Sequence, residues 1–303
     1  MRPAWSVLLL TTLIGAGQGL FVALFAAQLL GLGGSTLFLP GAALSLALLA
    51  AGLLASFFHL GHPERAWRSA AMWRTSWLSR EVLVLPAFMA VVFAWGVSHW
   101  QGTPSLAWGA AGVALALALF VCTGMIYACL PFLQEWRTPL TIVNFTLLGC
   151  ASGVTAAAAL AAWLQPALAR GYVAAALALG ALAYLGRLAS LSRNARLRPK
   201  STLASAIGVK HPKIVQIAQG AMGGSFNTRE FFHGRPREVV RAVRWSFLAL
   251  VFPVPALLLL SAAESAPVLG AAFILQYAGL LAERWYFFAE AKHPQNLYYQ
   301  AIA

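Results

Sequence analysis

The stretch that decides the fold is residues 107–130, AWGAAGVALALALFVCTGMIYACL, in which no side chain is charged. About 20 apolar residues in a helix are enough to cross the hydrocarbon core of a bilayer. Seven further stretches share this character, at 6–32, 39–60, 82–100, 139–164, 172–192, 245–263 and 267–288. Because the runs are continuously apolar rather than alternating, they indicate helices and not a membrane barrel. The sequence thus predicts an all-α, polytopic membrane protein with eight transmembrane helices.

Composition excludes a soluble protein of the same length. The 303 residues are 60% hydrophobic and 10% charged, whereas about 25% of a typical soluble chain is charged. Cys122, Cys129 and Cys150 all lie inside apolar runs, and no CxxC is present, so no zinc or iron–sulfur site is expected in this chain. We predict one membrane domain, residues 1–303, without a metal site.

Proline and glycine mark the expected ends of the spans, among them Gly33-Gly34, Pro40 and Pro139. Inside the seventh span, Pro253 and Pro255 predict a kink. No internal repeat is evident, which disfavours the inverted-repeat transporter folds. A small-solute transporter nevertheless remains an alternative, and it would need a polar pathway across the whole membrane.

The distribution of basic residues predicts the topology. Eight spans place both termini on one side, and that side holds eighteen of the 21 Lys and Arg residues, eleven of them within 193–244. The other side has Arg170 alone, while Arg187 and Arg284 lie near helix ends and are expected to snorkel towards the basic face. Since an excess of Lys and Arg marks the cytoplasmic side, both termini and the 193–244 loop are predicted to be cytoplasmic.

His59 and Glu81 are expected at the same membrane depth, because His59 ends the second span and Glu81 opens the third. An imidazole and a carboxyl group together suit a quinone, whose reduction takes two electrons and two protons at its two oxygens. Arg80 is a candidate partner for Glu81, and Trp77 a candidate wall for the head group. The alternative is that His59 is a polar residue at a helix end and Glu81 an acid favoured by the helix dipole.

A haem site is disfavoured because a bis-histidine haem needs two ligands at matching depth. His99 lies about 27 Å along the helix from Glu81, at the opposite face, where it is expected to be interfacial beside Trp100. Other polar residues within spans are each more often structural than functional; they include Tyr127, Asn144, Arg187, Glu283 and Arg284.

Two polar segments join the spans at their predicted cytoplasmic ends. In 61–80 tryptophans alternate with arginines, which is typical of an interfacial segment and is also compatible with a lid over a head-group pocket. In 193–244 we expect a docking surface for a soluble subunit, formed by Phe226, Arg229, Phe231, Phe232 and His233. The alternative is a loop packed on its own membrane face. The aromatic spacing matches no nucleic-acid motif. We therefore expect membrane lipid as a partner and no nucleic acid.

Five motifs resemble the membrane anchor subunit of dimethyl sulfoxide reductase-type molybdoenzymes: FHLGHP (58–63), SWLSRE (76–81), GMIYA (124–128), GGSFNTREFFHG (223–234) and AERWYFFAEA (282–291). The 223–234 motif is most similar to the branch of cytoplasm-facing sulfite dehydrogenases. The resemblance covers essentially the whole chain, and eight spans agree with it.

The resemblance implies a three-subunit complex in the bacterial inner membrane. A molybdopterin subunit would catalyse substrate chemistry, a four-cluster iron–sulfur subunit would pass electrons, and this anchor would bind ubiquinone or menaquinone. It also implies that His59 and Glu81, which match the family's quinol-linked histidine and glutamate, serve the quinone. We expect sulfite oxidation coupled to quinone reduction, or alternatively quinol oxidation that feeds reduction of a sulfoxide or another oxyanion.

Overall fold

The computed structural model describes residues 3–58, 60–198, 200, 202–211, 213–215, 217 and 237–292. Its described part is helical and contains no strand, which confirms the predicted all-α class. Eight segments are long and apolar enough to span a membrane. They are α1 (Trp5–Leu29), α2 (Ser35–Phe57), α3 (Trp77–Trp100), α4 (Leu106–Ala128), α5 (Pro139–Leu164), α6 (Ala169–Ala195), the pair α9 (Arg237–Val251) and α10 (Pro253–Ser261), and α11 (Ala266–Glu290). The described residues also form short helices at η1 (Pro63–Ala70), η2 (Pro166–Leu168) and α7 (Leu203–Ile207).

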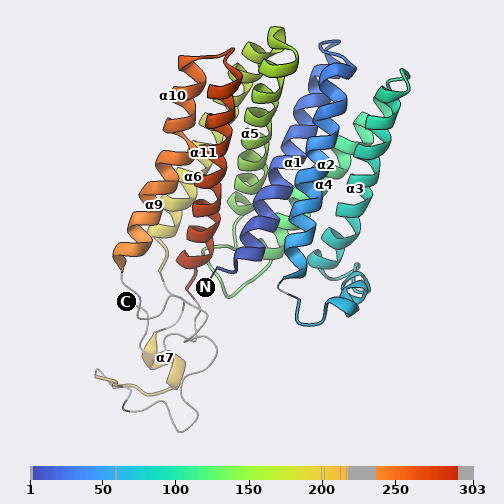
Figure 1. The fold of residues 1–303 in the computed structure, drawn as a ribbon. Helices are drawn as coiled ribbons and strands as arrows, with labels where there is room; N and C mark the ends of the chain where they lie inside the picture. Colours follow the sequence, from blue (N-terminus) through green and yellow to red (C-terminus); the bar gives the residue numbers. More distant parts are fainter. Residues whose placement is uncertain are drawn as a thin grey trace.

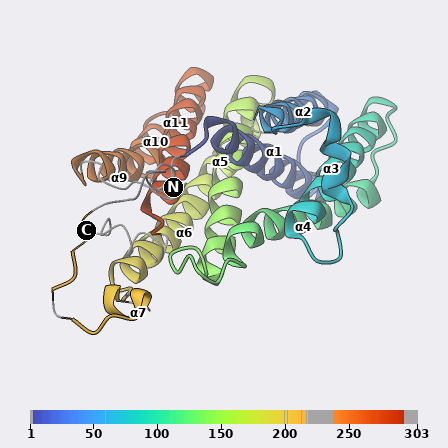
Figure 2. The ribbon, with the colours of Figure 1, turned by 90° about the horizontal axis from the view of Figure 1, so that it is seen from below.

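Helices α1 and α5 form the centre of the bundle (Figures 1 and 2). Helix α1 contacts α2, α4, α5 and α11, whereas α5 contacts α1, α4, α6, α11 and η2 and, less extensively, α2. Consequently α2, α3 and α4 lie on one side of this central pair, and α6, α9, α10 and α11 lie on the other. These are also the two most buried spans.

Glycines allow α1 and α5 to approach closely. A Cβ atom on Gly153 would lie 2.1 Å from the backbone carbon of Gly19, and one on Gly19 would lie 2.2 Å from the carbonyl oxygen of Gly149. Gly15 and Gly19 are four residues apart, as are Gly149 and Gly153. This is the small-xxx-small pattern with which membrane helices pack backbone against backbone.

The starts of α2 and α3 differ from the predicted ones. Pro40 does not end a run but lies inside α2, five residues after its start, where only one turn precedes it. Helix α3 begins at Trp77, capped by the Ser76 hydroxyl, which accepts a hydrogen bond from the Ser79 amide over 3.3 Å. Glu81 therefore lies one turn inside the helix, and the expected loop 61–80 shortens to 61–76.

The remaining boundaries concern the long polar segment. Helix α6 extends to Ala195 and α9 begins at Arg237, so helices occupy both edges of the predicted 193–244 loop. The kink expected at Pro253 and Pro255 is confirmed as a break at Phe252, between α9 and α10.

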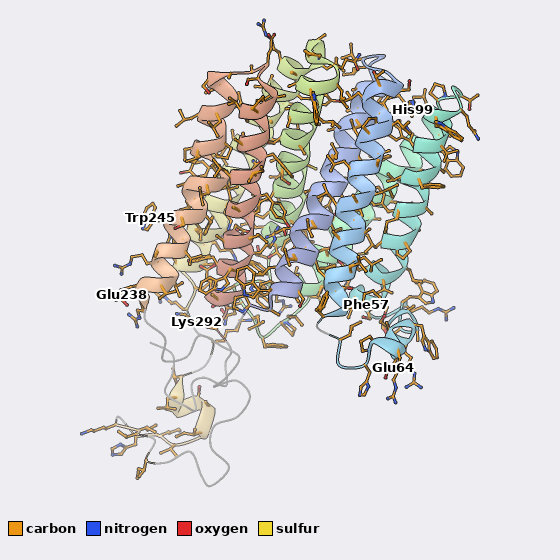
Figure 3. The ribbon with its side chains drawn as sticks, in the orientation of Figure 1. Phe57, Glu64, His99, Glu238, Trp245 and Lys292 are labelled. Carbon is orange, nitrogen blue, oxygen red and sulfur yellow. The ribbon has the colours of Figure 1, made fainter. Side chains whose placement is uncertain are left out.

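The start of α1, η1 and the end of α11 lie at one end of the bundle, which we call the basal end (Figure 1). Phe57 and Glu64 mark this end, and His99 marks the opposite, distal end (Figure 3). His99 thus lies at the face predicted for it. It is 6% exposed because the rings of Phe38 and Trp95 enclose it, and its expected place at the membrane interface stays a prediction.

Candidate functional site

Glu81 is a buried carboxylate at the basal end of the bundle. It lies on α3, faces α4 and is 7% exposed. The Thr123 hydroxyl of α4 donates a hydrogen bond to Glu81 Oε1. Within the described part of the chain no Lys, Arg or His side chain pairs with Glu81, and its Oε2 accepts no hydrogen bond. A carboxylate with one oxygen held and one free can bind a hydroxyl group and exchange a proton with it.

Arg80 and Trp77 lie beside Glu81 in sequence but interact elsewhere. Arg80 Nε donates to the carbonyl of Trp73 over 2.9 Å, and its Nη2 donates to the carbonyl of Arg74 over 2.7 Å. The Arg80 guanidinium lies 4.2 Å from the centre of the Trp77 ring. Arg80 therefore fastens the segment between η1 and α3 to the start of α3, and it does not bring its charge to Glu81.

Segment 61–76 has the character expected of a membrane interface. Helix η1 has no buried residue, and Trp67 and Trp73 are both exposed. Arg68 lies 5.6 Å from the Trp67 ring and Arg74 lies 5.4 Å from the Trp73 ring. Such aromatic and cationic pairs suit the head-group layer of a bilayer.

Several predicted site residues lie outside the described residues. His59 is one of them, although its chain neighbours Phe58 and Leu60 are described. The expected docking residues also fall there, namely Phe226, Arg229, Phe231, Phe232 and His233. The structure therefore brings together Glu81 and Thr123, and the predicted pairing of Glu81 with His59 stays a prediction.

A buried ion cluster joins α6 and α11. Glu283 Oε1 lies 2.8 Å from Arg187 Nε, and Glu283 Oε2 accepts a hydrogen bond from Arg284 Nη1 over 2.9 Å. The three side chains are at most 4% exposed. The prediction that Arg187 and Arg284 snorkel towards the basic face was wrong, because a shared carboxylate and aromatic rings hold them inside the bundle.

Aromatic rings surround both arginines of this cluster. Arg284 lies 3.6 Å from the centre of the Phe145 ring, and Arg187 lies 5.3 Å from that of Phe247. Tyr127 stacks on Phe145, the ring that Arg284 contacts, and it lies on α4 one turn after Thr123, the residue that donates to Glu81. Tyr127 thus lies between the candidate site and the ion cluster, a position that sequence spacing did not reveal.

The residues present fit a quinone better than a metal ion. Among the described residues no group of three His, Cys, Asp or Glu side chains could hold a metal. Glu81 offers a carboxylate oxygen without a hydrogen-bond partner among the described residues, one turn inside the basal end of α3. A quinol hydroxyl would meet the need of that oxygen for a donor.

Comparison with known proteins agrees with the resemblance seen in the sequence. The family model described as DMSO reductase anchor subunit (DmsC) matches residues 1–299. The chain is also 53% identical, over 330 aligned positions and the whole of both chains, to one of the subunits of sulfite dehydrogenase from Allochromatium vinosum. The expected resemblance to the anchor subunits is thereby confirmed, whereas the cytoplasm-facing orientation stays a prediction. The chain belongs to the DMSO reductase anchor subunit (DmsC) family.

Proposed function

We propose that this anchor subunit is quinone-reactive and passes electrons between a docked iron–sulfur subunit and the quinone pool. The observation that carries the proposal is Glu81, buried at the basal end, hydrogen bonded to Thr123 and without a cationic partner among the described residues. An ionisable residue inside a membrane span is energetically costly, and its presence there therefore points to a function. The family and the similarity to a sulfite dehydrogenase subunit support sulfite oxidation as the electron source.

A bound quinone would accept two electrons and two protons, and the protein would supply the protons. Glu81 Oε2 is the atom from which a proton would move, and Thr123 fixes the other carboxylate oxygen so that Oε2 faces the head group. His59 would serve the second oxygen of the head group. Trp77, with Arg80 stacked on it, would limit access of water from the basal surface.

The proposal also includes a membrane topology and partner subunits. We place the basal end in the cytoplasm of a bacterium, with the chain in the inner membrane, because eighteen of 21 Lys and Arg residues belong to that side. The iron–sulfur and molybdopterin groups would reside on partner subunits. The 193–244 segment would dock the iron–sulfur subunit through its phenylalanines and basic residues, which would bring the nearest cluster close to Glu81.

Substitution of Glu81 tests the proposal. In the purified complex, Glu81→Gln is expected to lower quinone-coupled turnover by about 100-fold, since a proton-transferring side chain contributes about that much or more. Activity with a soluble artificial acceptor should persist, because the substrate and cluster sites lie on other subunits. His59→Ala should behave in the same way.

Glu64→Gln is the matched control. Glu64 is an exposed glutamate at the same end of the bundle, 3.0 Å from His62, and its replacement should leave both activities unchanged. Undiminished quinone coupling in Glu81→Gln and His59→Ala would refute the site. Loss of both activities in either variant would place the defect in assembly instead.

A further inference from the structure

The distal end of the bundle contains a cavity that the proposed function does not use. It has a volume of about 380 Å³ and lies between the α1–α2 turn and the α3–α4 turn. Gln28, Ser35 and His99 contribute polar groups to its wall, and Leu32, Phe38 and Leu106 contribute apolar ones. Its wall is therefore polar on one part and apolar on another, as the binding site of an amphipathic molecule requires.

His99 is the most unusual residue of this wall (Figure 3). It is 6% exposed, and its Nε2 has no hydrogen-bond partner within the described part of the chain. Ring contacts hold the imidazole, with centroid distances of 4.9 Å to Phe38 and 4.5 Å to Trp95. A buried polar nitrogen without a partner is unfavourable unless a ligand or water satisfies it.

The other polar groups of the wall include two further sources of hydrogen-bond donors. Helix α2 begins in the cavity at Ser35, after Gly34, and no side chain caps its first turn. The free amides and the dipole of such a 23-residue helix favour an anion. Gln28 Oε1 accepts a hydrogen bond from Trp95 Nε1 over 2.7 Å, which leaves the Gln28 amide NH2 group as a donor.

The surroundings favour a lipid over a dissolved ion. The cavity lies at helix ends, where α3 ends at Trp100 and the first turn of α4 contains Trp108. Both tryptophans are exposed, and tryptophans of this kind mark the level of the head groups. At this end Arg170 is already paired with Glu264 over 2.6 Å. Since no described residue supplies a free cation to the cavity wall, a dissolved anion would gain little, whereas a lipid would also bury its chains against the apolar wall.

We propose that this cavity binds the phosphodiester of a membrane phospholipid, with hydrogen bonds from His99 Nε2, the amide group of Gln28 and the first turn of α2. The lipid would seal the gap between the two distal turns. This inference does not depend on the quinone site, which lies at the other end of the bundle.

The test uses the whole complex, delipidated in detergent, and three probes: dioleoyl phosphatidylglycerol, dioleoylglycerol and inorganic phosphate. Binding is followed by native mass spectrometry and by the shift of Tm. Wild type should bind phosphatidylglycerol and be stabilised by it, and His99→Phe should raise the Kd about tenfold through loss of one hydrogen bond. His99→Gln, which keeps an N–H group, should restore part of the affinity.

Two further variants separate binding from folding. Ser35→Pro removes an amide donor at a position where proline suits a helix, so it should weaken lipid binding even if His99→Phe fails to fold. His62→Phe, an exposed histidine at the basal end, should bind phosphatidylglycerol as wild type does.

The three probes distinguish the possible outcomes. Equal binding of dioleoylglycerol, or unchanged binding in both His99→Phe and Ser35→Pro, would overturn the proposal. Stabilisation by inorganic phosphate alone would overturn the assignment to a lipid and identify the site as one for free anions.

Discussion

Replacement of Glu283 by glutamine is expected to lower the free energy of unfolding by about 3–5 kcal/mol, the usual cost of removing one partner of a buried ion pair. Glu283 is 1% exposed. Among the described residues it is the only carboxylate that contacts Arg187 and Arg284, at 2.8 and 2.9 Å. In Glu283→Gln two buried positive charges would face each other without a counter-charge.

The magnitude can be tested against a second substitution in the same cluster. Arg284→Met removes one positive charge, retains an apolar stem against Phe145, and leaves a neutral pair of Arg187 and Glu283. If charge balance determines stability, Arg284→Met should cost less than Glu283→Gln even though it removes more atoms. If packing dominates, the order should be reversed.

The assay is unfolding of the purified complex in mixed micelles, with Tm as a second readout. Glu290→Gln is the control, because Glu290 is only partly buried and accepts hydrogen bonds from Asn194 over 3.2 Å and from Tyr286 over 3.3 Å. Its loss should cost about 0.5–1.5 kcal/mol. A cost below about 1 kcal/mol for Glu283→Gln would refute the reasoning from buried charge.

Three further perturbations have defined outcomes. Gly153→Ala would place a Cβ atom 2.1 Å from the backbone of Gly19 and should prevent normal packing of α1 on α5. A lower Tm and a lower yield of the purified protein would report this effect. The control is Gly180→Ala, whose Cβ would lie in open space and which should be neutral or stabilising by up to about 1 kcal/mol. Thr123→Val should lower quinone-coupled turnover about tenfold while activity with an artificial acceptor persists, because Glu81 loses a hydrogen bond of about 1.5 kcal/mol. Burial raises the pKa of Glu135, in the turn between α4 and α5, above its ordinary value. The folded protein therefore holds this proton more tightly than the unfolded chain does. The free energy of unfolding should fall as the pH rises from the ordinary pKa through the raised pKa of the folded state. Tm measured from pH 4 to 8 should show this fall in wild type and a smaller one in Glu135→Gln.

The spans were predictable because membrane depth leaves a direct mark on composition. A run such as 107–130 cannot be soluble, and the observed helix, Leu106–Ala128, agrees with it to within two residues. The start of α3 was harder to predict than the ends of α4, since Trp77 and Arg80 are typical of a polar interfacial segment. The cap by Ser76, which extends the helix by five residues, depends on local hydrogen bonding and not on hydropathy.

Lateral contacts were the least predictable part of the site. Glu81 was identified from its charge and its depth, yet nothing in the spacing indicated that Thr123, 42 residues further on, would donate to it. Glu283 and Arg284 were noted as neighbours in sequence, but the third member, Arg187, comes from another helix. Single-sequence reasoning gives the depth of a residue in a membrane, whereas the rotation of helices about their axes depends on packing, here of Gly15 and Gly19 against Gly149 and Gly153.

The central claim is that a quinone head group binds beside Glu81. The most direct test is photolabelling of the purified complex with an azido-quinone, followed by mass spectrometric mapping of the modified peptides. We predict labelling of the start of α3 and the end of α4, on peptides that contain Glu81 or Thr123, and suppression of the label by excess unlabelled quinone. Labelling confined to other helices, or undiminished in Glu81→Gln, would contradict the account.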